Sequence, residues 1–102
     1  MNLIIDVDGV MTDGSFYYNE NGKQFKKFGP HDSDGLNLLK THLNISFITA
    51  DQKGFYISNK RINDLGFELK LVKENERIDY FKKIGFENSI FIGDGHFDAI
   101  IL

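Results

Sequence analysis

The sequence predicts a single three-layer α/β domain over residues 1–102, in which a mainly parallel sheet lies between helices. Short apolar runs, typical of buried strands, alternate along the chain with segments of helical periodicity. Strands joined by helical crossovers pair in parallel, and the crossovers are right-handed. The length of 102 residues fits one domain with a modest core.

The first elements are a buried strand and a β-hairpin. The apolar run at 3–5 is bounded by acidic residues and glycine, which indicates a strand that ends there. A hairpin is predicted over about 15–28, because a turn sequence with an Asn-Gly pair separates two strand-like segments. Gly29 and Pro30 end this hairpin.

Helices and strands then alternate to the end of the chain. The first helix begins at Asp32 or Ser33, either of which can cap it, and it carries leucines at helical spacing. The second runs from about 55 to 65 and ends at Gly66, and the third ends at Gly85. The remaining strands are predicted at 45–48, 68–72 and 89–92.

Composition excludes several classes of function. The net charge is −3 with acidic and basic residues interspersed, which offers no footprint for nucleic acid. The absence of cysteine excludes thiolate metal sites, and no apolar run is long enough to cross a membrane. We therefore expect a cytoplasmic protein. The hairpin is rich in aromatic residues, which suggests a surface that a partner covers. These residues are Phe16, Tyr17, Tyr18, Phe25 and Phe28.

The candidate site begins with two carboxylates at the end of the first strand. Asp6 and Asp8 share one face if the backbone stays extended. Crowded carboxylates repel unless a cation lies between them, and oxygen ligands suit Mg²⁺. One carboxylate could attack an electrophile while the other moves a proton. The competing interpretation is a strand that simply enters an Asx and glycine turn.

Other strand ends add polar residues to the same edge of the sheet. Thr49, Lys73 and Asp94 each follow a predicted strand, and ligands bind beyond the carboxyl ends of parallel strands. Each has a second interpretation: Thr49 as a helix cap, Lys73 as a solvated lysine, and Asp94 with Asp98 as turn residues. Their joint occurrence in this order favours one shared crevice.

These motifs resemble those of the haloacid dehalogenase superfamily of phosphotransferases. Residues 6–10 resemble its first motif, Thr49 its second, Lys73 its third, and residues 93–98 its fourth, of the form GDxxxD. The first motif together with the aromatic hairpin resembles the capless branch that contains 3-deoxy-D-manno-octulosonate 8-phosphate phosphatase. The resemblance implies a Rossmann-like fold with a projecting hairpin.

The resemblance also implies roles for these residues. Asp6 would be the nucleophile that becomes an aspartyl phosphate, and Asp8 the general acid and then the general base. Mg²⁺ would be held by Asp6, the Asp8 backbone carbonyl and Asp94. Other residues would bind the phosphoryl group or support the site. These are Thr49, Lys73 and Gly9 for the phosphoryl group, and Asp98 as a supporting residue.

The chain also departs from the branch. Asp51 stands where the branch usually has arginine, so we expect weaker phosphate affinity. Arg77 competes with Lys73 for the third-motif role. The chain stops shortly after Asp98, so we expect it to lack the usual C-terminal segment.

Two classes of function remain open. The first is a Mg²⁺-dependent phosphatase of a small acidic sugar phosphate, either 3-deoxy-D-manno-octulosonate 8-phosphate or a nine-carbon keto-acid 9-phosphate, which assembles as a homotetramer through the hairpin. The alternative is a weak or inactive oligomerisation and metal-binding module, related to the phosphatase-like domain of acylneuraminate cytidylyltransferases.

Overall fold

A four-stranded parallel sheet forms the centre of the molecule. The computed structural model describes residues 1–29 and 32–93. The strand order is β5-β4-β1-β6, and all neighbouring pairs are parallel. The strands are β1 (Asn2–Asp6), β4 (Asn44–Thr49), β5 (Leu69–Leu71) and β6 (Ser89–Ile92). The predicted parallel sheet is thus confirmed, with the strand that carries Asp6 in its interior.

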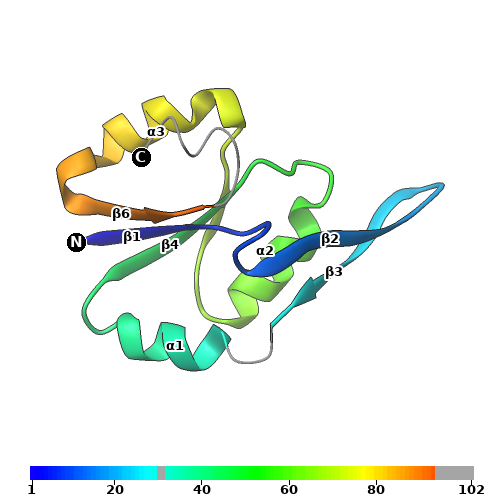
Figure 1. Ribbon diagram of the computed structural model, residues 1–102, viewed down its shortest axis with the longest axis horizontal. Helices are drawn as coiled ribbons and strands as arrows, with labels where there is room; N and C mark the ends of the chain where they lie inside the picture. Colours follow the sequence, from blue (N-terminus) through cyan, green and yellow to red (C-terminus); the bar gives the residue numbers. More distant parts are fainter. Residues whose placement is uncertain (30–31, 94–102) are drawn as a thin grey trace.

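Helices cover both faces of the sheet (Figure 1). They are α1 (Asp32–Leu39), α2 (Phe55–Asp64) and α3 (Arg77–Ile84), with short 3-10 turns η1 (Glu74–Glu76) and η2 (Phe86–Asn88). On one face, Leu36 of α1 and Ile62 of α2 pack with alternate residues of β1 and β4. On the other, Phe81 of α3 packs with Ile4 and Ile48. These two apolar layers confirm the three-layer prediction.

The hairpin forms a separate two-stranded sheet that projects from the body (Figure 1). It consists of β2 (Thr12–Asn19) and β3 (Gly22–Phe28), which pair antiparallel with irregular register. Asn19 lies opposite Gly22, so only residues 20–21 form the loop. The hairpin is therefore confirmed, and its first strand begins three residues earlier than predicted.

The helix ends follow the predicted signals. Gly66 and Gly85, just after α2 and α3, have φ angles of 91° and 102°, which glycine adopts without steric cost. Lys73 precedes the η1 turn, and α3 begins at Arg77. None of the helices within the described residues has the length and apolarity needed to cross a membrane.

Candidate active site

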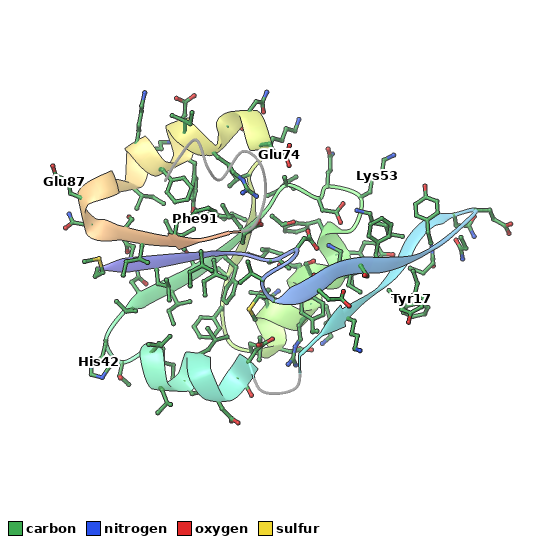
Figure 2. The ribbon with its side chains drawn as sticks, in the orientation of Figure 1. Tyr17, His42, Lys53, Glu74, Glu87 and Phe91 are labelled. Carbon is green, nitrogen blue, oxygen red and sulfur yellow. The ribbon has the colours of Figure 1, made fainter. Side chains whose placement is uncertain are left out.

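The carboxyl ends of β1 and β4 bring together three predicted site residues: Asp6, Asp8 and Thr49. Asp6 is the last residue of β1 and lies opposite Ile48. The pairing continues one step further, because the Val7 N–H donates to the Ile48 carbonyl at 3.1 Å. In Figure 2, Lys53 on the loop after β4 and Glu74 at the start of η1 lie at this end of the sheet. These residues therefore lie at the edge where the crevice is predicted.

Asp6 is a buried carboxylate with a buried cation beside it. Its side chain lies within the fold, and Arg77 Nη2 donates to Asp6 Oδ1 at 3.2 Å. Arg77 is the first residue of α3, and its guanidinium carbon lies 5.9 Å from the ring centre of Phe91, which Figure 2 labels between β6 and α3. A buried carboxylate requires such compensation. Arg77 and Lys73 are the two candidates for the third-motif role, and Arg77 is the one that contacts Asp6.

Asp8 lies beyond the strand, in a turn. The Val7 carbonyl accepts hydrogen bonds from the N–H groups of residues 10–12, so the extended backbone ends before Asp8. The expectation that Asp6 and Asp8 share one face of a strand is wrong for this reason. The two Asp8 oxygens have separate partners: Lys26 Nζ donates to Oδ1 at 2.9 Å, and Thr49 Oγ1 donates to Oδ2 at 3.2 Å. Hydrogen bonds therefore hold both oxygens of the Asp8 carboxylate.

The turn between Asp6 and the hairpin depends on a threonine that the motif analysis did not single out. Thr12 is buried, and its hydroxyl oxygen accepts hydrogen bonds from the N–H groups of Gly9 at 3.2 Å and Gly14 at 3.1 Å. Gly9 has a φ of 85°, which strains other residues. The Gly9 N–H, predicted to bind a phosphoryl group, is thus engaged by Thr12 in this arrangement.

Lys26 from the hairpin lies at the centre of a polar network that the sequence analysis missed. Its side chain is only 1% exposed. Besides Asp8, its ammonium contacts Asp51 Oδ2 at 2.8 Å and Ser58 Oγ at 3.0 Å. Asp51 Oδ2 also lies 2.8 Å from Lys23 Nζ. The only signal in the sequence is the excess of lysine on the second hairpin strand, which does not say where each side chain points.

Asp51 is held in its charged form by these lysines. Burial alone would raise the pKa of its carboxyl group. Hydrogen bonds from Lys23, Lys26 and the Gly54 N–H outweigh burial and lower the pKa from 3.8 to about 2. The negative charge expected to repel a phosphate is therefore paired with two cations.

Lys73 occupies a different position from Arg77. It follows β5, is exposed, and within the described part of the chain its ammonium has no ion pair or hydrogen bond. Together with Ala50, Glu74 and Asn75, it lines a hollow of about 490 Å³. Ala50 directly follows Thr49, so this hollow opens beside the strand end that carries the predicted second motif.

The remaining predicted residues, Asp94 and Asp98, lie outside the described residues. β6 pairs with β1 so that Ile92 lies opposite Ile5, one residue before Asp6. Among the described residues, no group of three or more His, Cys, Asp or Glu side chains is placed to hold a metal. The predicted metal ligands among the described residues are the Asp6 carboxylate and the Asp8 backbone carbonyl. This oxygen donor chemistry fits a hard divalent cation such as Mg²⁺.

Comparison with known proteins identifies the family, although no protein-family model matches the chain. The sequence is 36% identical over 102 residues to the 3-deoxy-D-manno-octulosonate 8-phosphate phosphatase of Haemophilus influenzae, and the match covers 94% of this chain and 56% of that protein. This chain belongs to the haloacid dehalogenase superfamily. Within the superfamily it belongs to the 3-deoxy-D-manno-octulosonate 8-phosphate phosphatase-like branch, as the sequence motifs predict.

Solved structures from this branch of the haloacid dehalogenase superfamily share the fold. A cobalt-bound structure of the Haemophilus influenzae phosphatase gives a TM-score of 0.73 at 34% identity, covering 94% of this chain and 59% of that one. The Moraxella catarrhalis phosphatase, in complex with magnesium, phosphate and KDO, gives 0.73 at 27% identity, with 94% and 58% coverage. The chain thus spans a little over half the length of these superfamily relatives.

Proposed function

We propose that this chain carries the active site of a Mg²⁺-dependent phosphatase that hydrolyses the phosphate monoester of a small acidic sugar. The substrates proposed are 3-deoxy-D-manno-octulosonate 8-phosphate, which the relatives' names specify, or a nine-carbon keto-acid 9-phosphate. One observation carries the proposal. A buried carboxylate, Asp6, ends an interior strand of this fold, and a second, Asp8, lies two residues later with both oxygens held by hydrogen bonds.

The two carboxylates divide the chemistry between them. Asp6 attacks phosphorus, and the P–O bond to the sugar breaks. Asp8, in its protonated form, gives its proton to the leaving oxygen. Asp8 then takes a proton from water as the water attacks the aspartyl phosphate, which releases inorganic phosphate and regenerates Asp6. The contacts from Thr49 and Lys26, which donate to the ionised carboxylate, suit Asp8 to the second of these steps, because a general base must be held in a defined geometry.

Further residues would hold the cation and the transferring group. The Asp6 carboxylate, the Asp8 backbone carbonyl and Asp94 would hold Mg²⁺, which, when bound, neutralises charge on the phosphoryl oxygens. Thr49, Lys73 and Gly9 would bind the phosphoryl oxygens, for which the Thr49 hydroxyl and the Gly9 N–H would leave their present acceptors, Asp8 and Thr12. Asp98 would support Lys73 or the water around the cation. Lys73 suits this role because it lines the hollow beside Ala50 with its ammonium free of ion pairs within residues 1–29 and 32–93.

The alternative of an inactive binding module is not favoured. The alternative rests on Asp51, whose charge would oppose a phosphate, together with the expected lack of the usual C-terminal segment. In the structure Asp51 is neutralised by Lys23 and Lys26, at 2.8 Å each. The named relatives are phosphatases, and the carboxylate pair of the first motif is present.

The decisive experiment measures phosphate release from both sugar phosphates with Mg²⁺ and with EDTA. Activity should require the divalent cation. Asp6→Asn should lower kcat by about 1,000-fold or more, because the nearly isosteric amide is a poor nucleophile. Circular dichroism should show an unchanged fold.

Asp13→Asn is the matched control, since Asp13 is exposed and the Ser15 N–H is the one hydrogen-bond donor to its carboxylate among the described residues. It should retain wild-type activity. Substantial turnover by folded Asp6→Asn would exclude the covalent mechanism. A wild-type protein that releases no phosphate from either substrate would contradict the proposed function.

A further inference from the structure

The ammonium of Lys26 contacts three oxygens, one on the turn after β1, one on the loop before α2 and one on α2. Asp8 Oδ1, Asp51 Oδ2 and Ser58 Oγ lie at 2.9, 2.8 and 3.0 Å. Asp8 and Ser58 accept hydrogen bonds from the ammonium, and Asp51 forms an ion pair with it. With a side chain 1% exposed, Lys26 has no solvent to replace a lost partner. Its position is therefore set by these oxygens.

Asp51 is the second anionic partner of Lys26. Asp51 is itself held by the Gly54 N–H, which donates to Oδ1 at 3.1 Å, while its backbone N–H donates to Thr49 Oγ1 at 3.1 Å. Asp51 thus contacts both groups that hold the Asp8 carboxylate, Lys26 and Thr49. Removal of its charge would leave the buried Lys26 ammonium with Asp8 as its only anionic partner among the described residues.

The same contacts dock the hairpin against the body. Lys23 and Lys26 belong to β3, while Ser58 belongs to α2 and Asp51 precedes it. The Tyr56 hydroxyl adds a hydrogen bond to the Lys23 carbonyl at 3.1 Å. The placement of Lys26 beside Asp8 therefore depends on how β3 lies on the start of α2.

Gly54 provides an independent sign that this network is closely packed. A Cβ atom at this position would collide with Asp51 Oδ2 and would lie 3.0 Å from Lys26 Cε. The φ of Gly54 is −98°, a value that alanine adopts freely. A side chain at this position is therefore excluded by the lack of space and not by backbone strain. The backbone here leaves room for the Asp51–Lys26 contact and for nothing larger.

We infer that Asp51 is a positioning residue of the active site: it fixes the Lys26 ammonium against Asp8 and thereby sets the orientation of the Asp8 carboxylate. The inference rests on the proposed function of Asp8 as general acid and base. It differs from the view of Asp51 as a charge that repels phosphate. Repulsion acts on substrate binding, so its removal would lower KM, whereas loss of positioning lowers kcat.

The kinetic test uses 3-deoxy-D-manno-octulosonate 8-phosphate with saturating Mg²⁺. Asp51→Asn and Gly54→Ala should each lower kcat by about tenfold to 100-fold, the range expected for a misplaced catalytic group, with KM changed by less than about threefold. Lys26→Met should lower kcat at least as much. Adding Asp51→Asn to Lys26→Met should cost little more, because both act through the same ammonium.

Matched controls come from exposed charges outside the network. Lys27→Met removes the neighbouring lysine of β3, which is exposed. Asp64→Asn removes the partner of Lys60 in an exposed pair on α2. Both controls should keep wild-type kcat and KM.

A second measurement does not depend on activity. In protein with ¹⁵N-labelled lysine side chains, NMR should detect the Lys26 ammonium protons as slowly exchanging in the wild type. This protection should be lost in Asp51→Asn and reduced in Asp8→Asn, while the fold is retained.

The outcomes separate the two proposals. An unchanged kcat in Asp51→Asn, a lower KM alone, or persistent protection of Lys26 without Asp51 would each overturn the positioning role. If wild-type protein releases no phosphate, the proposed function fails, and the NMR result alone decides whether Asp51 fixes Lys26 against Asp8.

Discussion

At the scale of single residues, the sequence indicates which side chains meet but not how they pair. Asp6, Asp8 and Thr49 could be placed at one edge because each follows a buried strand, and parallel strands end together. The contact of Lys26 with Asp8 could not be predicted, because it joins residues 18 positions apart through the docking of a hairpin. Such contacts depend on tertiary packing, which strand periodicity does not encode.

Arg77 and Lys73 illustrate the same limit. Both follow the same strand, four residues apart, and only the start of α3 at Arg77 decides that Arg77 contacts Asp6 while Lys73 is exposed. We expect the two cations to have different roles. Arg77 compensates a buried charge, and Lys73 is available to a phosphate.

Replacement of each cation by methionine should therefore give distinct results. Arg77→Met should lower the free energy of unfolding by about 3 kcal/mol, because Asp6 loses a buried ionic partner. Lys73→Met should leave stability unchanged and lower kcat/KM by about tenfold or more through loss of phosphoryl binding. Urea unfolding and steady-state kinetics measure the two effects.

Lys70→Met is the control for Lys73, since Lys70 is an exposed lysine on β5, the strand that Lys73 follows. Equal kcat/KM for Lys73→Met and Lys70→Met would contradict a role for Lys73. Unchanged stability of Arg77→Met would show that Asp6 needs no compensation from Arg77.

At the scale of elements, the sequence predicted the strands and helices well where glycine or periodicity marks their limits. α2 and α3 end beside Gly66 and Gly85, as expected. The turn after β1 was less predictable, since its geometry depends on the Thr12 side chain rather than on glycine alone. A threonine near a glycine is too common a pattern to reveal such a role.

Thr12→Val tests the importance of that hydroxyl. Valine keeps the shape but leaves the Gly9 and Gly14 N–H groups without their acceptor, so the free energy of unfolding should fall by about 1–3 kcal/mol. Thermal or urea unfolding measures this change. Thr12→Ser keeps the hydroxyl and should lose less stability. Equal losses for valine and serine would show that packing, and not hydrogen bonding, explains the position.

At the scale of the whole molecule, the parallel sheet explains why one edge collects the chemistry. β1 lies between β4 and β6, so its carboxyl end adjoins the ends of both neighbouring strands. The fold of a single chain does not explain why the hairpin projects from the body. The molecule measures 43 × 31 × 18 Å, and the hairpin extends from the body at the active-site end (Figure 1).

The hairpin exposes aromatic surface on both of its faces. Tyr17, Tyr18 and Phe25 are 66–68% exposed, and Phe16 is 44% exposed. Phe16 and Tyr18 contact each other, with ring centres 6.1 Å apart, and Tyr17 contacts Phe25 at 6.4 Å. Exposed apolar clusters of this kind mark interaction sites, and a two-stranded ribbon is marginally stable without support.

We propose that equivalent hairpins of this chain cover one another in a homotetramer. Tyr17→Lys with Phe25→Lys would introduce charges into such a contact, and light scattering at micromolar concentration should then report smaller particles than for the wild type. Phe16 is left unchanged because the centre of its ring lies 4.3 Å from Lys23 Nζ, and Lys23 forms an ion pair with Asp51 near the candidate site. Leu38→Lys, an exposed apolar position on α1, is the control and should leave the assembly intact. A wild-type protein that is monomeric under these conditions would contradict self-association through the hairpin.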